Sequence, residues 1–284
     1  MGRADRISTA SGDRLRRLAS VCRLLPGLIV AASLSACATP VGDSLFQPAA
    51  LAAKPPVWTG QAPVLVRATA DDTGLRLTGW HWPARATGGD ILVYLPGRAG
   101  NRDVWAERAQ AFAEGGQGVL VASYRGYGDN AGTPSEAGLY EDGRAFVRLA
   151  RRLHPRGRLF LFGDTLGAAV ALRIAADTPV DAVVTLGAFD TYARFVPKLA
   201  RPFYGDAFNN VEVIKRVSVP VLLMHGAKDE VVPLEAAERL KTAAGGKVVV
   251  VPIAGEAYHA FDLRHIAPVV WQALQHIAET PPRT

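Results

Sequence analysis

Cysteine is almost absent from this 284-residue chain, because only Cys22 and Cys37 occur. A domain that begins after Cys37 has no thiol, which excludes disulfide bonds, cysteine nucleophiles and cysteine-based metal sites from it. The apolar run from residue 24 to 34 is too short to cross a bilayer comfortably. A large net charge is also lacking outside the first 36 residues. The chain carries a net +6, but six arginines against Asp5 and Asp13 place +4 of that charge in the first 36 residues. The remainder, about +2, gives little support to nucleic-acid binding.

The first 36 residues have the pattern of a secretory leader, with an arginine-rich start followed by the apolar run 24–34. That run ends in Leu-Ser-Ala-Cys37, which resembles the lipobox of bacterial lipoproteins. The resemblance implies cleavage before Cys37, a diacylglyceryl group on its thiol and palmitate-type acylation of the new N-terminus. The alternative is an ordinary secretory leader with a chance cysteine. We expect a lipid-anchored, periplasm-facing protein, with the outer membrane favoured over the inner because Ala38 is no Asp-type retention signal.

The domain organisation predicted from composition has three parts. Residues 1–36 form the signal peptide, and residues 37–63, rich in Ala and Pro, form the lipid anchor and an extended tether. Residues 64–280 form the folded domain. No internal repeat interrupts it.

Hydrophobic patterning predicts strands that alternate with helices across that domain. The expected strands cover residues 64–68, 75–82, 90–95, 118–123, 159–162, 181–186, 219–225 and 247–253. The expected helices cover residues 103–113, 135–153, 168–176, 234–243 and 265–277. The first two strands flank the turn Asp71-Asp-Thr-Gly74 and should form an antiparallel hairpin, and Ser135 is a plausible N-cap. This alternation favours an α/β class: a mostly parallel central sheet with helices on both faces.

The most informative stretch is Leu159-Phe-Leu-Phe-Gly-Asp-Thr-Leu-Gly167, which a strong helix-forming segment follows. A buried strand, a Gly-x-x-x-Gly turn and a helix are the layout of the nucleophile elbow. Gly163 and Gly167 would let the strand and helix backbones approach where a Cβ would clash. The residue at the apex is Thr165.

Four loops in this order resemble those of the α/β-hydrolase superfamily, in its prolyl-oligopeptidase-like and lysophospholipase-like branch. They are the elbow, Leu95-Pro-Gly-Arg-Ala-Gly-Asn101, Tyr124-Arg-Gly-Tyr-Gly-Asp-Asn-Ala-Gly132 and His225-Gly-Ala-Lys-Asp-Glu-Val-Val-Pro233. The resemblance covers about residues 64–277. It implies the α/β-hydrolase fold with a short lid, which the aromatic, proline-broken segment 189–204 could supply. Ordinary packing of a short connection is an equal alternative for that segment.

The resemblance also implies a catalytic triad in the chain order nucleophile, acid, base. Thr165 stands where the family has Ser, Asp229 lies in the acid turn, and His259 lies between the last strand and the last helix. His225, inside the acid motif, should pack or hydrogen-bond locally. The remaining histidines lie in strand or helix contexts that favour a structural role; they are His81, His154, His265 and His276.

The oxyanion hole of the family uses two backbone N–H groups. The resemblance assigns them to Leu166, at the start of the elbow helix, and to Arg98, in the loop where Pro96 replaces the usual His. Backbone donors tolerate such side-chain changes.

These residues predict a hydrolase that acts on a carboxylic ester, thioester or amide, a small-molecule substrate, without a metal or organic cofactor. Thr165 weakens the prediction, because a β-branched residue is unfavourable in a strained elbow and its methyl crowds the carbonyl. The alternative is an impaired pseudo-hydrolase that serves as a binding or envelope-scaffold protein. An acyltransferase would use the same triad, so the sequence does not separate it from a hydrolase.

Overall fold

The computed structural model describes residues 45–196, 198–199, 207–255 and 261–279. The leader with Cys37, the base candidate His259 and part of the expected lid segment lie outside these residues. Residues from Gln47 onward form one compact unit, and the fold below is that of this unit.

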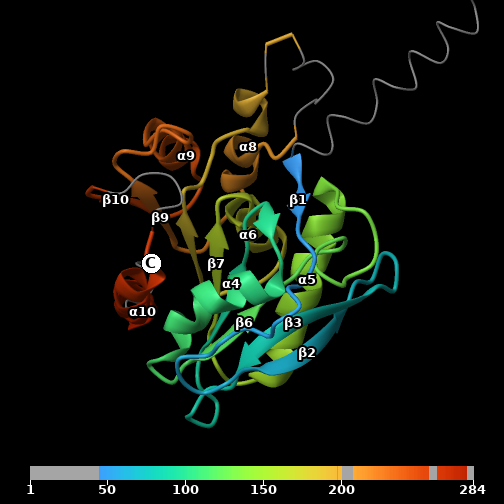
Figure 1. Ribbon diagram of the computed structural model, residues 1–284. Helices are drawn as coiled ribbons and strands as arrows, with labels where there is room; N and C mark the ends of the chain where they lie inside the picture. The colour runs from blue at the N-terminus through green and yellow to red at the C-terminus, as the bar shows by residue number, and fades with distance from the viewer. Residues whose placement is uncertain (1–44, 197, 200–206, 256–260, 280–284) are drawn as a thin grey trace, which may run out of the picture. The chain divides into compact units, whose positions relative to one another are not determined.

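The unit is built on an eight-stranded sheet with the order β10-β9-β8-β7-β4-β6-β3-β2 (Figure 1). The strands pair in parallel from β10 to β6, whereas β3 is antiparallel to both β6 and β2. The strands are β2 (Val64–Thr69), β3 (Arg76–Trp82), β4 (Ile91–Leu95), β6 (Gly118–Val121), β7 (Leu159–Asp164), β8 (Ala182–Leu186), β9 (Val221–Gly226) and β10 (Val248–Ile253). The predicted hairpin of β2 and β3 is confirmed.

Helices cover both faces of the sheet, as the sequence predicted. One face carries a row of contacting helices, and the other carries α4, η1 and α10. The first group is α5 (Glu136–Leu153), α6 (Leu166–Asp177), α8 (Asn210–Ile214) and α9 (Glu235–Ala243), and the second is α4 (Arg102–Ala109), η1 (Gln110–Ala113) and α10 (Leu263–Glu279). Ser135 caps α5 as expected, since its hydroxyl accepts from Gly138 N at 3.1 Å. Among the described residues, no helix combines the length and apolar character that crossing a membrane requires.

The core on the α4–α10 face is aromatic, and two phenylalanines of β7 lie at its centre. Residues two apart on a strand share a face. Phe162 stacks on Tyr94 at 5.4 Å and meets Phe112, while Phe160 meets Trp271 edge-on. The Trp271 indole N–H donates to the Phe112 carbonyl at 2.9 Å, which ties α10 to η1. The strand that carries the elbow is therefore anchored along its buried face.

A buried ion cluster fixes the loop after β6. The guanidinium of Arg125 pairs with the fully buried Asp142 of α5 and with Asp72 of the hairpin turn. Tyr124 and Tyr127 of the same loop donate their hydroxyls to the carbonyls of Pro96 and Arg98, at 3.2 and 2.6 Å. The loop that follows β4 is held in place by these contacts.

Part of the expected tether packs on the domain instead of extending away from it. Two-residue strand β1 (Gln47–Pro48) pairs with β5 (Ala99–Gly100). The side-chain amide of Asn101 donates to Ala50 O at 2.7 Å, and Trp58 packs edge-on against Trp80. A proline-rich composition predicts an extended chain, and an extended chain can equally well pair with a loop and pack a half-buried aromatic residue on the domain.

A histidine pair gives the domain an acid-sensitive contact. His81 of β3 and His154, at the end of α5, are both buried, with their Nε2 atoms 3.1 Å apart. The Gly89 carbonyl accepts from His154 Nδ1 at 2.9 Å, so His81 Nε2–H donates to the bare His154 Nε2. Burial, and then the neighbouring His154, lower the pKa of His81 to about 4.

Because the folded-state pKa of His81 lies below its unfolded value, the neutral pair stabilises the fold above pH 6.5. We expect roughly 2 kcal/mol of this stability to be lost as the pH falls from 6.5 toward 4. Urea unfolding at pH 7.5, 6 and 5 measures the loss. His81→Gln should flatten the curve relative to wild type, whereas His265→Gln, at an exposed position, should not. Parallel curves for wild type and His81→Gln would contradict the expectation.

Candidate active site

Thr165 lies at the apex of a strained turn between β7 and α6. Its backbone has φ 51° and ψ −97°, and Phe208 is the only other described non-glycine residue with positive φ. A β-branched residue in this region is unfavourable and marks a position held by its surroundings. The turn has the strand–turn–helix layout that the sequence predicted for a nucleophile elbow, and Thr165 as the nucleophile stays a prediction.

The two elbow glycines are needed for space. A Cβ at Gly163 would lie 2.5 Å from Ala168 Cα, and one at Gly167 would lie 1.9 Å from Leu95 O. Real Cβ atoms do not approach backbone so closely, so the start of α6 sits directly against β7 and the end of β4 because both residues lack a side chain.

The Thr165 side chain is buried and already has a partner. Its hydroxyl donates to Asp164 Oδ1 at 3.0 Å, and its backbone N–H donates to Leu186 O at 2.9 Å. The hydroxyl lies on the side of Gly187, where a Cβ would be 3.8 Å from Oγ1. Thr165 thus faces the end of β8, the strand between its own and the strand that carries Asp229.

Asp229 follows β9 in a tight turn. One carboxylate oxygen, Oδ1, accepts from the N–H groups of Val231 and Val232, at 2.9 and 2.8 Å. The other oxygen, Oδ2, is buried, and none of the described residues donates to it. A buried carboxylate oxygen without a donor is costly, so this atom is suited to receive an N–H group.

The carboxyl ends of parallel strands bring Thr165 and Asp229 to one rim. They follow β7 and β9, which are two strand spacings apart in the sheet, or roughly 10 Å. That separation leaves room for one imidazole between two side chains. His259 follows β10, the next strand along the same rim, but it lies outside the described residues.

The other histidines have the structural surroundings that the sequence favoured. His225 is fully buried, and its Nε2–H donates to Val232 O at 2.5 Å, which braces the acid turn. His81 and His154 form the buried pair described above. His265 and His276 are exposed on α10.

The backbone of the loop after β4 lies beside the elbow. A Cβ on Gly97 would be 3.5 Å from Asp164 O, and one on Gly167 would be 2.7 Å from Pro96 O. Arg98 is next in this loop, and Leu166 is the first residue of α6, whose helix dipole adds positive potential at its N-terminus. The two predicted oxyanion donors therefore belong to segments in contact.

Asp164 was missed by sequence reasoning, although it immediately precedes Thr165. Its buried carboxylate accepts from the Tyr94 hydroxyl at 2.9 Å, and the Arg108 guanidinium lies 3.4 Å from the same oxygen. An acidic residue next to the expected nucleophile was the available signal. Nothing in the sequence marked Tyr94 or Arg108, because their approach depends on how α4 packs over the sheet.

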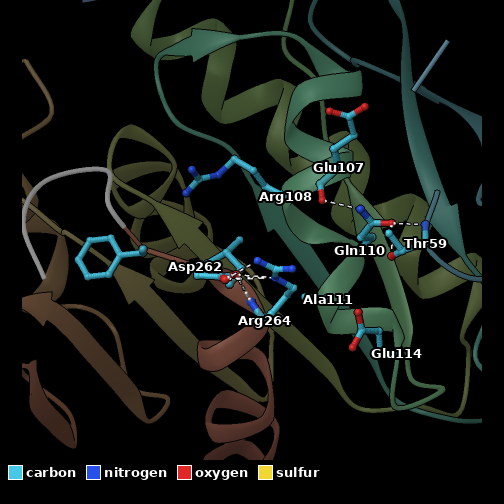
Figure 2. Close-up of a pocket in the computed structure, with 10 residues that line it drawn as sticks. Thr59, Glu107, Arg108, Gln110, Ala111, Glu114, Asp262 and Arg264 are labelled. Atoms are coloured by element: carbon cyan, nitrogen blue, oxygen red, sulfur yellow. Dashed lines mark hydrogen bonds and ion pairs between the residues drawn. The ribbon is translucent and has the colours of Figure 1, made fainter. Parts of the chain in front are cut away.

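A cavity of about 230 Å³ adjoins this cluster between α4, η1 and the start of α10 (Figure 2). Arg108 lines it and extends away from Glu107 and Gln110. The opposite wall includes Asp262, which forms an ion pair with Arg264 at 2.7 Å. The cavity is smaller than most ligand pockets. Within the described ranges, no three His, Cys, Asp or Glu side chains gather as metal ligands would.

Comparison with known proteins agrees with this fold. A family profile described as alpha/beta hydrolase fold matches residues 90–215. The Mycobacterium tuberculosis protein Rv2307c, which bears the description uncharacterized, is 38% identical over 193 residues, covering 64% of this chain and 68% of its own. The chain belongs to the α/β-hydrolase fold family, as the sequence predicted.

Two further similarities come from named hydrolases. Lysophosphatidylserine lipase ABHD12 of Macaca fascicularis is 28% identical over 186 residues, which cover 57% of this chain and 47% of the lipase. The structure of the Pyrococcus furiosus esterase Pf2001 superposes with a TM-score of 0.60 at 19% identity, covering 83% of this chain and 96% of the esterase. At that identity the second match shows the fold alone. A lipase is thus among the relatives that this chain resembles in sequence, and an esterase shares its fold.

Proposed function

We propose that this protein hydrolyses a carboxylic ester, thioester or amide through Thr165, His259 and Asp229. The supporting observation is that an elbow-apex hydroxyl and a buried carboxylate oxygen without a described donor lie on one rim of the sheet, at the ends of β7 and β9. The relative named a lysophosphatidylserine lipase favours an ester over an amide.

In this mechanism the Thr165 hydroxyl turns its hydrogen from Asp164 to His259, and Oγ1 attacks the carbonyl carbon while His259 accepts the proton. Asp229 Oδ2 would accept the imidazole N–H and fix its tautomer. The N–H groups of Arg98 and Leu166 would stabilise the oxyanion. His259 then protonates the leaving group. Water next attacks the acyl carbon while His259 accepts a proton from it, and His259 returns that proton to Thr165 Oγ1 as the acid product leaves.

The test is a panel of short- and medium-chain nitrophenyl esters assayed with wild type and His259→Ala. We expect the variant to lose on the order of a thousandfold or more in kcat/KM, because no other base is proposed for the Thr165 proton. His265→Ala, exposed on α10, is the matched control and should keep the wild-type rate. Equal turnover by wild type and His259→Ala rejects the triad.

One observation favours a second candidate, a non-catalytic binding protein. The Thr165 hydroxyl donates to Asp164, and its β-branched side chain occupies a positive-φ elbow. This candidate predicts no labelling of wild type by a fluorophosphonate probe and restored labelling in Thr165→Ser. Labelling of the wild-type peptide that contains Thr165, identified by mass spectrometry, would reject it.

The lipid anchor at Cys37 and the periplasm-facing outer-membrane location remain proposals that rest on the lipobox-like sequence alone. Incorporation of labelled palmitate by wild type but not by Cys37→Ala tests the anchor. Labelling of both proteins, or of neither, would contradict it.

A further inference from the structure

Asp164 is a buried carboxylate with donors from three parts of the fold. Its Oδ2 accepts from Tyr94 of β4 at 2.9 Å and lies 3.4 Å from Arg108 of α4. Its Oδ1 accepts the Thr165 hydroxyl at 3.0 Å. The long-range partners hold one carboxylate oxygen, which turns the other toward the proposed nucleophile.

Both long-range donors keep their hydrogens over the working pH range. Tyr94 is fully buried, and burial raises its pKa well above the ordinary value, with a further rise from the Asp164 charge. Burial opposes the charge on Arg108, but Tyr94 and Asp164 outweigh it and raise its pKa. On Oδ2 the carboxylate therefore keeps the Tyr94 hydroxyl as a donor at 2.9 Å and the Arg108 guanidinium as a longer contact at 3.4 Å, and a hydrogen bond to an ionised group is stronger than one between neutral groups.

Thr165 has a rotamer problem that serine would not have. Its Cβ carries a hydroxyl and a methyl, and each staggered χ1 places them at different positions. In a fixed elbow backbone, the wrong rotamer puts the methyl where the attacking oxygen should be. The bond to Asp164 favours the rotamer of the structure, in which Oγ1 lies 3.0 Å from the Asp164 carboxylate and on the Gly187 side.

We infer that Asp164 is a positioning residue: its carboxylate, oriented by Tyr94 and Arg108, holds Thr165 in the rotamer that presents the hydroxyl and turns the methyl away. This role rests on the proposed function. It explains how a β-branched residue serves at an elbow apex. It also predicts that replacing Asp164 lowers kcat more when residue 165 is threonine than when it is serine.

A double-mutant cycle tests that prediction. Asp164→Ala should lower kcat on the best nitrophenyl ester by tenfold or more in the Thr165 protein, with KM nearly unchanged. In the Thr165→Ser protein the same change should cost threefold or less, since serine has no methyl to misplace. Tyr94→Phe keeps the ring stacked on Phe162 and removes only one donor, so it should lower kcat several-fold, again mainly in the Thr165 protein. Melting temperatures check that each variant is folded, and Tyr94→Phe carries the test if Asp164→Ala does not fold.

Asp164→Asn separates positioning from proton removal. Either orientation of the amide keeps a hydrogen bond to Thr165 Oγ1, but an amide is not a base. Retention of kcat within about fivefold of wild type, with an unchanged pH profile, supports positioning. A loss as large as that of Asp164→Ala, with a displaced acid limb, would make Asp164 the base and overturn the inference.

The remaining outcomes are also decisive. Equal losses in the Thr165 and Thr165→Ser proteins would assign Asp164 to the general stability of the elbow and overturn the inference. A higher kcat in Asp164→Ala would mean that the bond restrains the nucleophile instead of presenting it. If wild type and Thr165→Ser both lack turnover and probe labelling, the proposed function fails, and the role of Asp164 fails with it.

Discussion

Replacement of Thr165 by valine is expected to abolish ester hydrolysis and fluorophosphonate labelling. Valine has the same shape and β-branch, so the strained backbone at φ 51° and the buried volume are kept. Only the hydroxyl and its bond to Asp164 are lost. We expect kcat/KM to fall on the order of a thousandfold or more, to the level left by binding alone. Nitrophenyl ester kinetics measure the change.

Thr165→Ser is the matched variant and should act in the opposite direction. Loss of the methyl removes crowding at the carbonyl and relieves strain at the elbow. A gain of up to about tenfold in kcat is expected, less than the roughly hundredfold cost of a 1 Å misplacement, because the bond to Asp164 already places the hydroxyl. If Thr165→Val keeps the wild-type rate, the hydroxyl is not the nucleophile, whatever the serine variant does.

Gly167→Ala is expected to destabilise the domain severely. The added Cβ would lie 1.9 Å from the carbonyl oxygen and 2.5 Å from the carbonyl carbon of Leu95, and neither atom can move without separating β4 from the elbow. We expect a loss of more than about 4 kcal/mol, a size reached only by a few mechanisms such as overpacking of a buried contact. In a domain of this size the melting temperature should drop by about 10 °C or more, or the protein should be insoluble.

Gly60→Ala is the control for this experiment, since a Cβ there would have nothing within 4 Å. Its melting temperature should stay within about 2 °C of wild type. A folded Gly167→Ala protein with the same melting temperature as Gly60→Ala would show that the close contact between α6 and β4 is not required.

Local patterns in the sequence were sufficient for most elements. The alternation of strands and helices predicted the parallel sheet, and the Asp71–Gly74 turn predicted the hairpin of β2 and β3. The cap at Ser135 and the two elbow glycines were found because each depends on neighbours within a few residues. The packing of residues 47–61 on the domain could not be predicted, because an extended segment has no periodicity that indicates which surface it contacts.

The site also has residues that local motifs predicted and features that they did not. Thr165 and Asp229 could be placed at strand ends from motifs, and the structure puts both at one rim of the sheet. The lack of a donor to Asp229 Oδ2 among the described residues could not be foreseen, because it depends on which groups surround a folded turn. The assignment of His259 as the base remains a prediction.

The sequence by itself determined the class of fold, the elbow and the hydroxyl at its apex. Strand and helix periodicity and glycine turns depend only on residues that are close together in the chain. Only the tertiary structure decided what that hydroxyl touches. Tyr94 and Arg108 stand 70 and 56 residues before Asp164, and they meet its carboxylate because β4 pairs with β7 and α4 lies across the sheet. Hydrogen bonds of a buried carboxylate are set by three-dimensional proximity, which no local pattern records.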